Sequence, residues 1–156
     1  MPITVILEDA RTSASQQLIA ELSAELGARY GDDGSALFKP EDVMIPRAAF
    51  VVARLDDEPV GCGALRPMYH DTAIAEIKRM YVRPAARGKG ISRQILAKLE
   101  ALAAENGYRV VQLETGTLQH EAIGLYESSG FARIPCFGPY VDNPLSICYE
   151  KRVNTV

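Results

Sequence analysis

The sequence predicts an α/β fold in which a mixed, mostly antiparallel central sheet is flanked by helices. Short apolar runs typical of strands occur along the whole chain, and two stretches in its second half have the period of helices. Three consecutive strand-like runs are separated by turns too short for a crossover helix, which indicates antiparallel pairing. At 156 residues the chain is long enough to bury a sizeable core, and we expect one domain over residues 1–156.

The first part of the chain is predicted to form a strand and a helix, followed by an irregular segment. ITVIL, residues 3–7, is the strand-like run, and Asp9 or Thr12 can cap the helix that follows. The apolar side of this helix is formed by Leu18, Ile19 and Leu22. Turn residues dominate from Arg29 to Pro46, so we expect a loop there with a short helix near Pro40–Val43.

The middle of the chain is predicted to form the antiparallel meander, and the remainder adds two helices and three strands. The meander consists of residues 48–55, 60–68 and 73–82, joined by the turns DDEP and HDT. Apolar residues then recur on one helical face from Ile91 to Asn106, and Gly107 suits the position just past the helix end. A strand, a second helix and two last strands are predicted over residues 108–114, 118–129, 131–135 and 145–151.

Composition and charge exclude several classes of protein. Apolar residues make up 47% of the chain and charged residues 24%, which is ordinary for a globular protein. The formal net charge of −3 argues against a nucleic-acid partner, which would require a basic face. No apolar run is long enough to span a bilayer, and the first residues lack the pattern of a secretory signal. We therefore expect neither a nucleic-acid nor a membrane partner.

The cysteines and histidines are few and scattered. Cys62, Cys136 and Cys148 are an odd set without a CxxC pair, which is typical of reduced thiols in a cytoplasmic protein. His70 and His120 stand alone, without the spacing of metal ligands. We expect a cytoplasmic location and no metal site.

The segment MYVRPAARGKGIS, residues 80–92, places a glycine-rich basic loop between the last strand of the meander and the long helix. It is not a P-loop, because residue 83 is arginine where glycine is required and residue 90 is glycine where Ser or Thr is required. It is not a dinucleotide fingerprint either, because Arg93 stands in place of the third glycine.

The loop nevertheless has the features of an anion site. Glycines let the backbone turn tightly and approach a ligand closely. The first amides of the following helix have no partner within it, and the positive end of the helix dipole lies there. Two basic side chains add full charges. We predict that a pyrophosphate binds here, mainly to the main chain, at Arg87, Gly88, Lys89, Gly90, Ile91 and Ser92.

Here the sequence resembles the GCN5-related N-acetyltransferase (GNAT) family. The acetyl-CoA motif of that family, Gln or Arg followed by x-x-Gly-x-Gly or Ala, is matched at Arg87, Gly90 and Ser92, with serine as the last small residue. The family's A-x-x-L-Y-x-x-x-G-F block is similar to AIGLYESSGF, residues 122–131. The two blocks occur in the family's order, and the resemblance covers about residues 48–152. It implies a GNAT-type acyl-CoA N-acyltransferase fold.

The resemblance implies direct transfer of acetyl from acetyl-CoA to an amine in a ternary complex, assisted by a general acid and a general base. The acid is commonly the tyrosine of the second block, here Tyr126, although a tyrosine packed in the core would fit the same pattern. Glu76 is the candidate base, because some members carry a base at this place in the fourth strand. If the preceding hairpin turn is centred on Asp71, Arg66 lies opposite Glu76 and would keep it ionised as a weaker base. A chain of waters is the third possibility.

The resemblance also places the rest of the cofactor and the acceptor. The pantetheine arm runs along the fourth strand, here at Met80, Tyr81 and Val82, where the fourth and fifth strands splay apart. Glu114 and Glu121 near this opening either attract a cationic amine or belong to a solvated acidic surface. The acceptor is bound by segments that correspond to residues 29–46 and 136–144.

These observations predict an acetyl-CoA-dependent N-acetyltransferase that acts on a primary amine of a small molecule. An alternative role for Arg66 is to bind a carboxylate of the substrate instead of Glu76, which would indicate an amino-acid-like acceptor. A protein or peptide N-acetyltransferase and a non-catalytic acyl-CoA-binding sensor are the alternatives. The sequence leaves a homodimer open.

Overall fold

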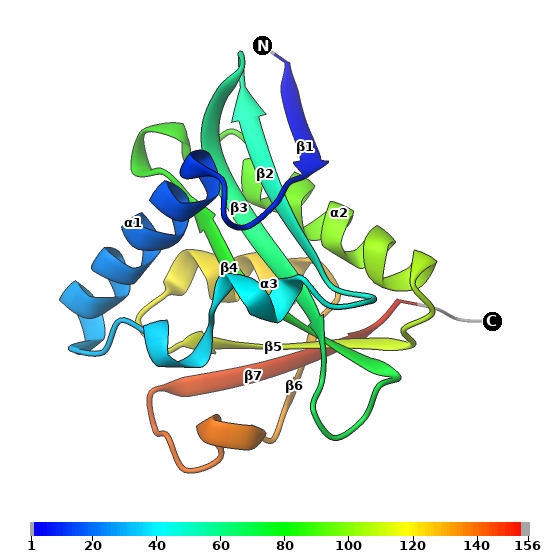
Figure 1. Ribbon diagram of the computed structural model, residues 1–156. Helices are drawn as coiled ribbons and strands as arrows, with labels where there is room; N and C mark the ends of the chain where they lie inside the picture. Colours follow the sequence, from blue (N-terminus) through cyan, green and yellow to red (C-terminus); the bar gives the residue numbers. More distant parts are fainter. Residues whose placement is uncertain (1, 154–156) are drawn as a thin grey trace.

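The computed structural model describes residues 2–153, which form a seven-stranded sheet flanked by helices (Figure 1). The strands follow one another across the sheet in the order β1-β2-β3-β4-β5-β7-β6. Only β4 and β5 are parallel, and the other neighbours are antiparallel. The strands are β1 (Ile3–Leu7), β2 (Ala49–Leu55), β3 (Glu58–Pro67), β4 (Ile74–Val82), β5 (Val110–Gly116), β6 (Ala132–Ile134) and β7 (Ser146–Arg152).

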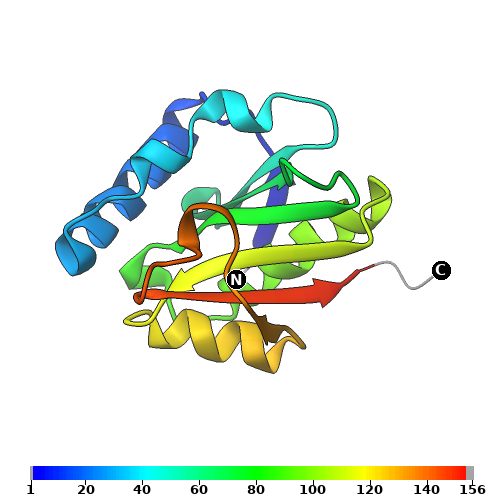
Figure 2. The same cartoon turned by 90° about the horizontal axis from the view of Figure 1, so that it is seen from below.

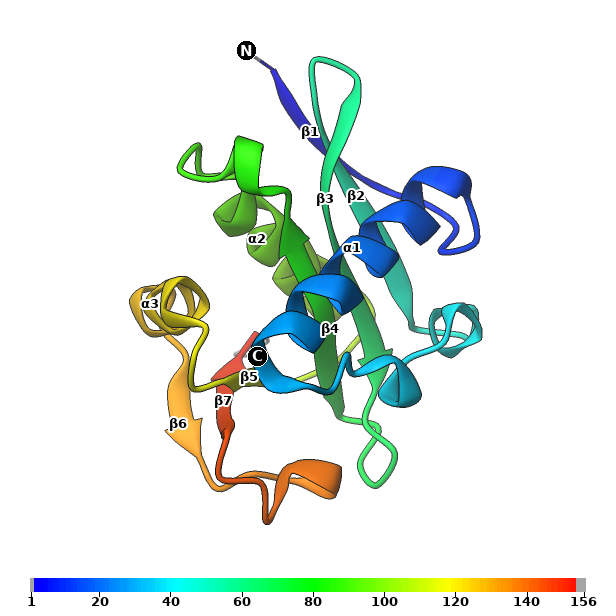
Figure 3. The same ribbon diagram turned by 90° about the vertical axis from the view of Figure 1, so that its left-hand side faces the viewer.

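The helices cover both faces of the sheet. The α-helices are α1 (Ser13–Tyr30), α2 (Ile91–Glu105) and α3 (His120–Ser128), and short 3-10 turns are η1 (Ser35–Leu37), η2 (Pro40–Val43), η3 (Pro84–Ala86) and η4 (Gly138–Tyr140). Figures 2 and 3 show α1 on one face and α3 on the other, and in Figure 3 α2 lies on the same side as α3. Within residues 2–153 no helix has the length and apolar character needed to cross a membrane.

Each face of the sheet has its own core, as the alternation of side chains along a strand requires. Val51 and Leu65 point toward α2, whose residues Ile95 and Leu99 are fully buried against them. The intervening residue Val52 belongs to the cluster on the other face, which contains Leu18, Leu22, Phe38, Phe50 and Tyr81. Thus α1 and the segment that follows it are fixed over the ends of β3 and β4.

The predicted order of strands and helices is confirmed, including the antiparallel meander β2–β3–β4. Thr12 is the residue that caps α1, since its hydroxyl accepts a hydrogen bond from the Ser15 amide at 3.2 Å. The short helix predicted at Pro40–Val43 is the 3-10 turn η2. The fold class predicted from the sequence is therefore correct.

Strands β4 and β5 pair only over their first halves. Ile74–Ile77 of β4 pairs with Val110–Leu113 of β5. Beyond these residues, β4 continues to Val82 and β5 to Gly116 without pairing with each other. The expected splay between these two strands is confirmed. It opens the sheet beside the glycine-rich loop.

A β-bulge interrupts β4 in the half that is paired with β3 but not with β5. Cys62 of β3 pairs with Tyr81 and Ala64 pairs with Lys78, so Arg79 and Met80 stand opposite the single residue Gly63. Arg79 has a φ of +57°, a conformation that non-glycine residues rarely adopt. The bulge alters the direction of side chains at this point in the strand.

The prediction of reduced thiols is wrong for two of the three cysteines. Cys136 and Cys148 form a disulfide with a Cα–Cα distance of 5.1 Å. Ile134 of β6 pairs with Cys148 of β7, so Cys136, two residues farther along, is close to the same partner. Cys62 is free and fully buried, and burial raises the pKa of its thiol to about 12.

Candidate active site

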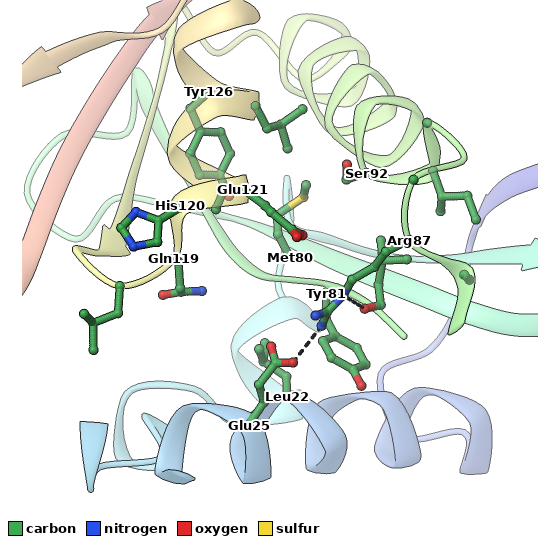
Figure 4. A pocket seen from close by; sticks show the side chains of 18 of the residues that line it. Leu22, Glu25, Met80, Tyr81, Arg87, Ser92, Gln119, His120, Glu121 and Tyr126 are labelled. Carbon is green, nitrogen blue, oxygen red and sulfur yellow. Dashed lines mark hydrogen bonds and ion pairs between the residues drawn. The ribbon is translucent and has the colours of Figure 1, made fainter. Parts of the chain in front are cut away.

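A cavity of about 280 Å³ lies beside the glycine-rich loop, between α1, the end of β4 and α3 (Figure 4). We call it the glycine-loop cavity. Lys89 has an exposed side chain and does not line it. The other residues predicted to bind the cofactor all line it, namely Met80, Tyr81, Val82, Arg87, Gly88, Gly90, Ile91 and Ser92.

The start of α2 forms one wall of the glycine-loop cavity. Gly88 and Gly90 have φ values of +80° and +78°, and a Cβ at either position would meet no atom within 4 Å. The glycines are therefore required by backbone conformation and not by lack of space. Gly90 caps α2 without any side-chain hydrogen bond, and the first turn contains no acidic residue. The first amides of α2 are thus available to an anion in the cavity.

Arg87 extends from the loop to α1 on the opposite wall. Its Nη2 lies 2.7 Å from the Glu25 carboxylate, and its Nε donates to the Val82 carbonyl at 2.9 Å (Figure 4). Part of the positive charge predicted to meet a pyrophosphate is therefore shared with Glu25. The sequence did not reveal this partner, because α1 lies far from the loop along the chain.

A second cavity, of about 230 Å³, lies on the other side of Met80, and we call it the bulge cavity. It is enclosed by β4, β5, the end of α1 and the β6–β7 loop. Both segments that the resemblance assigned to the acceptor contribute to it, through Tyr30 and Leu37 on one side and Tyr140 and Asn143 on the other. The two cavities share Leu22, Met80, Gln119 and Tyr126 as lining residues. They therefore meet where β4 and β5 part.

Tyr126 lies at this meeting point and is 5% exposed. Its ring packs against Phe131 and Tyr149, with centroids 5.8 and 5.9 Å apart. No hydrogen bond among residues 2–153 involves its hydroxyl, whose oxygen is not fully enclosed, so the proton is not committed to another group. Burial, and next the charge of Glu114, raises the pKa of the phenol well above its usual value. The phenol is protonated at neutral pH and faces both cavities.

Glu76 lines the bulge cavity but is held in an ion pair. The Arg66 Nε lies 3.0 Å from its carboxylate, and the side chain of Glu76 is 8% exposed. Arg66 and Glu76 are opposite one another in the β3–β4 register, as the hairpin argument predicted. Arg66 also binds Asp42 at 2.8 Å and thereby connects η2 to the sheet. The interpretation of Glu76 as an ion-pair partner has direct geometric support, and its role as a base remains a prediction.

Other charged residues of the bulge cavity were missed or misplaced by sequence reasoning. Glu114 is only partly exposed and accepts a hydrogen bond from the Ser146 hydroxyl at 2.6 Å, so it is not part of a solvated acidic surface. Glu121 is exposed at the mouth of the glycine-loop cavity. Lys78 and Arg79 both line the bulge cavity, and no signal in the strand pattern indicated the bulge that brings them there. Among the described residues, no group of three or more His, Cys, Asp and Glu side chains is arranged to hold a metal ion.

A mixed sheet with one parallel pair that parts beside a glycine-rich loop defines the class of acyl-CoA N-acyltransferases. The model of the Acetyltransferase (GNAT) family matches residues 15–131, and the chain belongs to this family. The resemblance inferred from the two sequence blocks is thereby confirmed, and so is the prediction that the protein is an acetyltransferase.

Individual proteins support the same assignment. The chain is 38% identical over 149 residues to the IAA acetyltransferase of Azospirillum brasilense, covering 96% of this chain and 97% of that one. A crystal structure of a candidate acyl-CoA N-acyltransferase from Klebsiella pneumoniae has a TM-score of 0.80 and 30% identity, covering 97% of both chains. The acetyltransferase yncA of Salmonella typhimurium, solved with its cofactor acetyl-CoA, has a TM-score of 0.74 at 19% identity, covering 100% of this chain and 96% of that one. This last likeness concerns the fold alone.

Proposed function

We propose that the protein transfers the acetyl group of acetyl-CoA to a primary amine of a small molecule, by direct attack within a ternary complex. The observation that supports this most strongly is the meeting of the two cavities at Met80 and Tyr126. A thioester that enters from the glycine-loop cavity and an amine that enters from the bulge cavity would meet there. Membership of the acetyltransferase family and the 38% identity to an acetyltransferase support the choice of an acetyl donor.

The proposed chemistry uses the chain's own groups at the moment of transfer. The lone pair of the neutral amine forms a bond to the thioester carbonyl carbon, and the C–S bond breaks with its electron pair on sulfur. The thiolate takes the proton of the Tyr126 hydroxyl, and a proton leaves the nitrogen for a base or water. The products are the N-acetyl amine and CoA, and Tyr126 regains its proton from solvent.

The dimensions of the bulge cavity favour a small acceptor over a protein. Pockets that hold drug-sized ligands have volumes of roughly 300–1,000 Å³, and the bulge cavity, at about 230 Å³, is smaller. The name of the IAA acetyltransferase likewise specifies a single compound and not a protein. A free hydroxyl on Tyr126 at the junction argues against a sensor without turnover, which would not need a proton donor there.

The cytoplasmic location remains a prediction. It depended on the expectation of reduced thiols, and the Cys136–Cys148 disulfide removes part of that basis, because such bonds are rare in reducing compartments.

The proposal is tested with a matched pair of glycine variants at the two ends of α2. Gly90→Glu places bulk and negative charge where the pyrophosphate is proposed to bind, and Gly107→Glu introduces the same residue at a φ of +82° with equally open space. Each substitution costs about 1–2 kcal/mol of backbone strain. We expect calorimetry to show that Gly90→Glu no longer binds acetyl-CoA and that Gly107→Glu binds normally. CoA release with a panel of primary amines should follow the same pattern. Unchanged affinity in folded Gly90→Glu would overturn the assignment of the donor site.

A further inference from the structure

The bulge in β4 places two consecutive basic residues in one cavity. In a regular strand Lys78 and Arg79 would point to opposite faces of the sheet. Here both line the bulge cavity, because Arg79 adopts the left-handed conformation at the bulge. This conformation is unfavourable for a non-glycine residue, and bulges often redirect a side chain next to a functional site.

Arg79 has a buried guanidinium group that is only partly satisfied. The residue is 7% exposed, and its Nη1 donates to the Ser23 hydroxyl at 3.0 Å. Its Nη2 is the one side-chain nitrogen or oxygen in residues 2–153 that is itself fully enclosed and has no hydrogen-bond partner. The Phe38 ring lies 5.7 Å from the guanidinium carbon, and no carboxylate of the described residues lies within 4 Å. A buried cation without an anion is costly, so the site is incomplete as it stands.

Lys78 adds a second unpaired cation. Its Nζ donates to the Tyr140 hydroxyl at 2.8 Å, which uses one of three N–H groups. In the described part of the chain no carboxylate lies within 4 Å of Nζ. Burial lowers the pKa of this ammonium group, as expected where water has been removed without a compensating anion.

Glu114 stands on β5, on the other side of the opening between the two strands. Its carboxylate accepts a hydrogen bond from Ser146 and has no cation within 4 Å among residues 2–153. Burial raises its pKa, while Lys78 acts on it at longer range in the opposite direction. Glu114 lines the bulge cavity together with Tyr126, the residue at which transfer is proposed.

The other acidic residues that line the bulge cavity need no counter-ion there. Glu76 is paired with Arg66, and Asp32 is exposed to solvent. Among the described residues of the cavity, the buried or half-buried charges without an ion-pair partner are therefore two cations on β4 and one carboxylate on β5.

From this arrangement we infer that the acceptor is a small amino acid, whose carboxylate is bound by Lys78 and Arg79 while its amine is directed toward Glu114 and Tyr126. The inference rests on the proposed function, since it names the class of acceptor for that reaction. A simple amine or a polyamine would place a cation beside Lys78 and Arg79 without neutralising them. A dicarboxylate without an amine would leave Glu114 unmatched and would have no nucleophile.

The test compares amino acids with their carboxamides as acceptors. The carboxamide matches the amino acid in size and keeps the amine, but it has lost the negative charge. CoA release is measured for the twenty amino acids, their carboxamides and simple primary amines, with acetyl-CoA saturating. We expect at least one amino acid to have a kcat/KM about 10- to 150-fold above that of its carboxamide, the span of one or two charge-assisted hydrogen bonds.

Variants then locate the carboxylate site. Lys78→Met keeps the length of the side chain and removes the charge, so KM for the amino acid should rise about 10- to 150-fold, while that for the carboxamide changes little. Arg79→Lys keeps a positive charge but loses the planar fork, and it should give a smaller rise. Lys98→Met on α2 is the control, because Lys98 lines neither cavity. Melting temperature and acetyl-CoA affinity confirm that each variant is folded.

Each outcome decides between the two proposals. Preference for carboxamides or simple amines over amino acids would overturn the amino-acid inference and leave the proposed function intact. Equal KM values for the amino acid in wild type and in folded Lys78→Met and Arg79→Lys would overturn the assignment of these two residues. Absence of CoA release with every amine, in protein that binds acetyl-CoA, would overturn the proposed function and the inference with it.

Discussion

The ion pair between Arg66 and Glu76 can be separated from catalysis by comparing its two halves. Glu76→Gln removes the charge of the carboxylate and keeps the size of the side chain. Arg66→Met removes the guanidinium and keeps an apolar stem. We expect both variants to lose stability, and we expect Arg66→Met to lose more.

The structure explains this inequality. After Glu76→Gln, Arg66 keeps its contact with Asp42 at 2.8 Å and remains 23% exposed. The loss is then about 1.5–3 kcal/mol, the usual contribution of a hydrogen bond to a charged group. After Arg66→Met, the Glu76 carboxylate is left 8% exposed without its cation, which costs about 3–5 kcal/mol. For a domain of this size about 2–4 °C is lost per kcal/mol, so the melting temperature should fall by roughly 3–12 °C and 6–20 °C respectively.

Thermal unfolding followed by circular dichroism measures these shifts, and the double variant completes a thermodynamic cycle. The rate–pH profile is recorded on the same proteins. If Glu76 has only a structural role, the folded Glu76→Gln variant should keep the low-pH limb of the wild-type rate–pH profile. Loss of that limb, together with an unchanged melting temperature, would refute the structural interpretation and establish Glu76 as the base.

Three further predictions follow from residues described above. Tyr126→Phe removes only the hydroxyl, so turnover should fall by roughly 10²–10⁴-fold with acetyl-CoA affinity nearly unchanged, and equal turnover would show that Tyr126 only packs the core. The disulfide closes a loop with a sequence separation of 12, so Cys136→Ser should lower stability by about 2–4 kcal/mol in chemical unfolding, and reductant should affect wild type but not the variant. Burial raises the pKa of Glu114 in the folded state, so its contribution to stability is lost as pH rises through that pKa. Glu114→Gln should therefore gain melting temperature relative to wild type as pH increases, and a pH-independent difference would contradict the assignment.

The glycine-loop cavity, the proposed donor site, was predictable because its signals are local in the sequence. A strand that ends near a proline, two glycines that permit positive φ and a helix that begins at once are all encoded within residues 80–92. The block around Tyr126 is likewise contiguous. Such features can be recognised without knowledge of the tertiary fold. Gly88, Gly90 and Tyr126 accordingly line the cavity that the sequence pattern predicts.

The bulge cavity, the proposed acceptor site, was not predictable to the same degree, because its residues are brought together by tertiary contacts. The bulge at Arg79 depends on the register between β3 and β4, and the alternation of apolar residues along β4 does not reveal it. The Arg87–Glu25 pair and the Cys136–Cys148 bond depend on how distant segments pack. The Arg66–Glu76 pair was predictable, since a hairpin turn fixes the register of neighbouring strands.

The parting of β4 and β5 also bears on how the sheet is protected against pairing with another chain. It gives the sheet an internal edge, with backbone groups of β4 beyond Ile77 that have no partner on β5. Exposed edges of this kind usually invite another chain to add a strand, which is a common start of aggregation. Here the gap narrows to a closed end where Ile77 pairs with Leu113, and α1 covers one of its faces. A wedge that is closed at one end has room for a single extended chain but not for the edge of a second sheet, so the geometry that leaves backbone groups open to a ligand also disfavours sheet-to-sheet pairing.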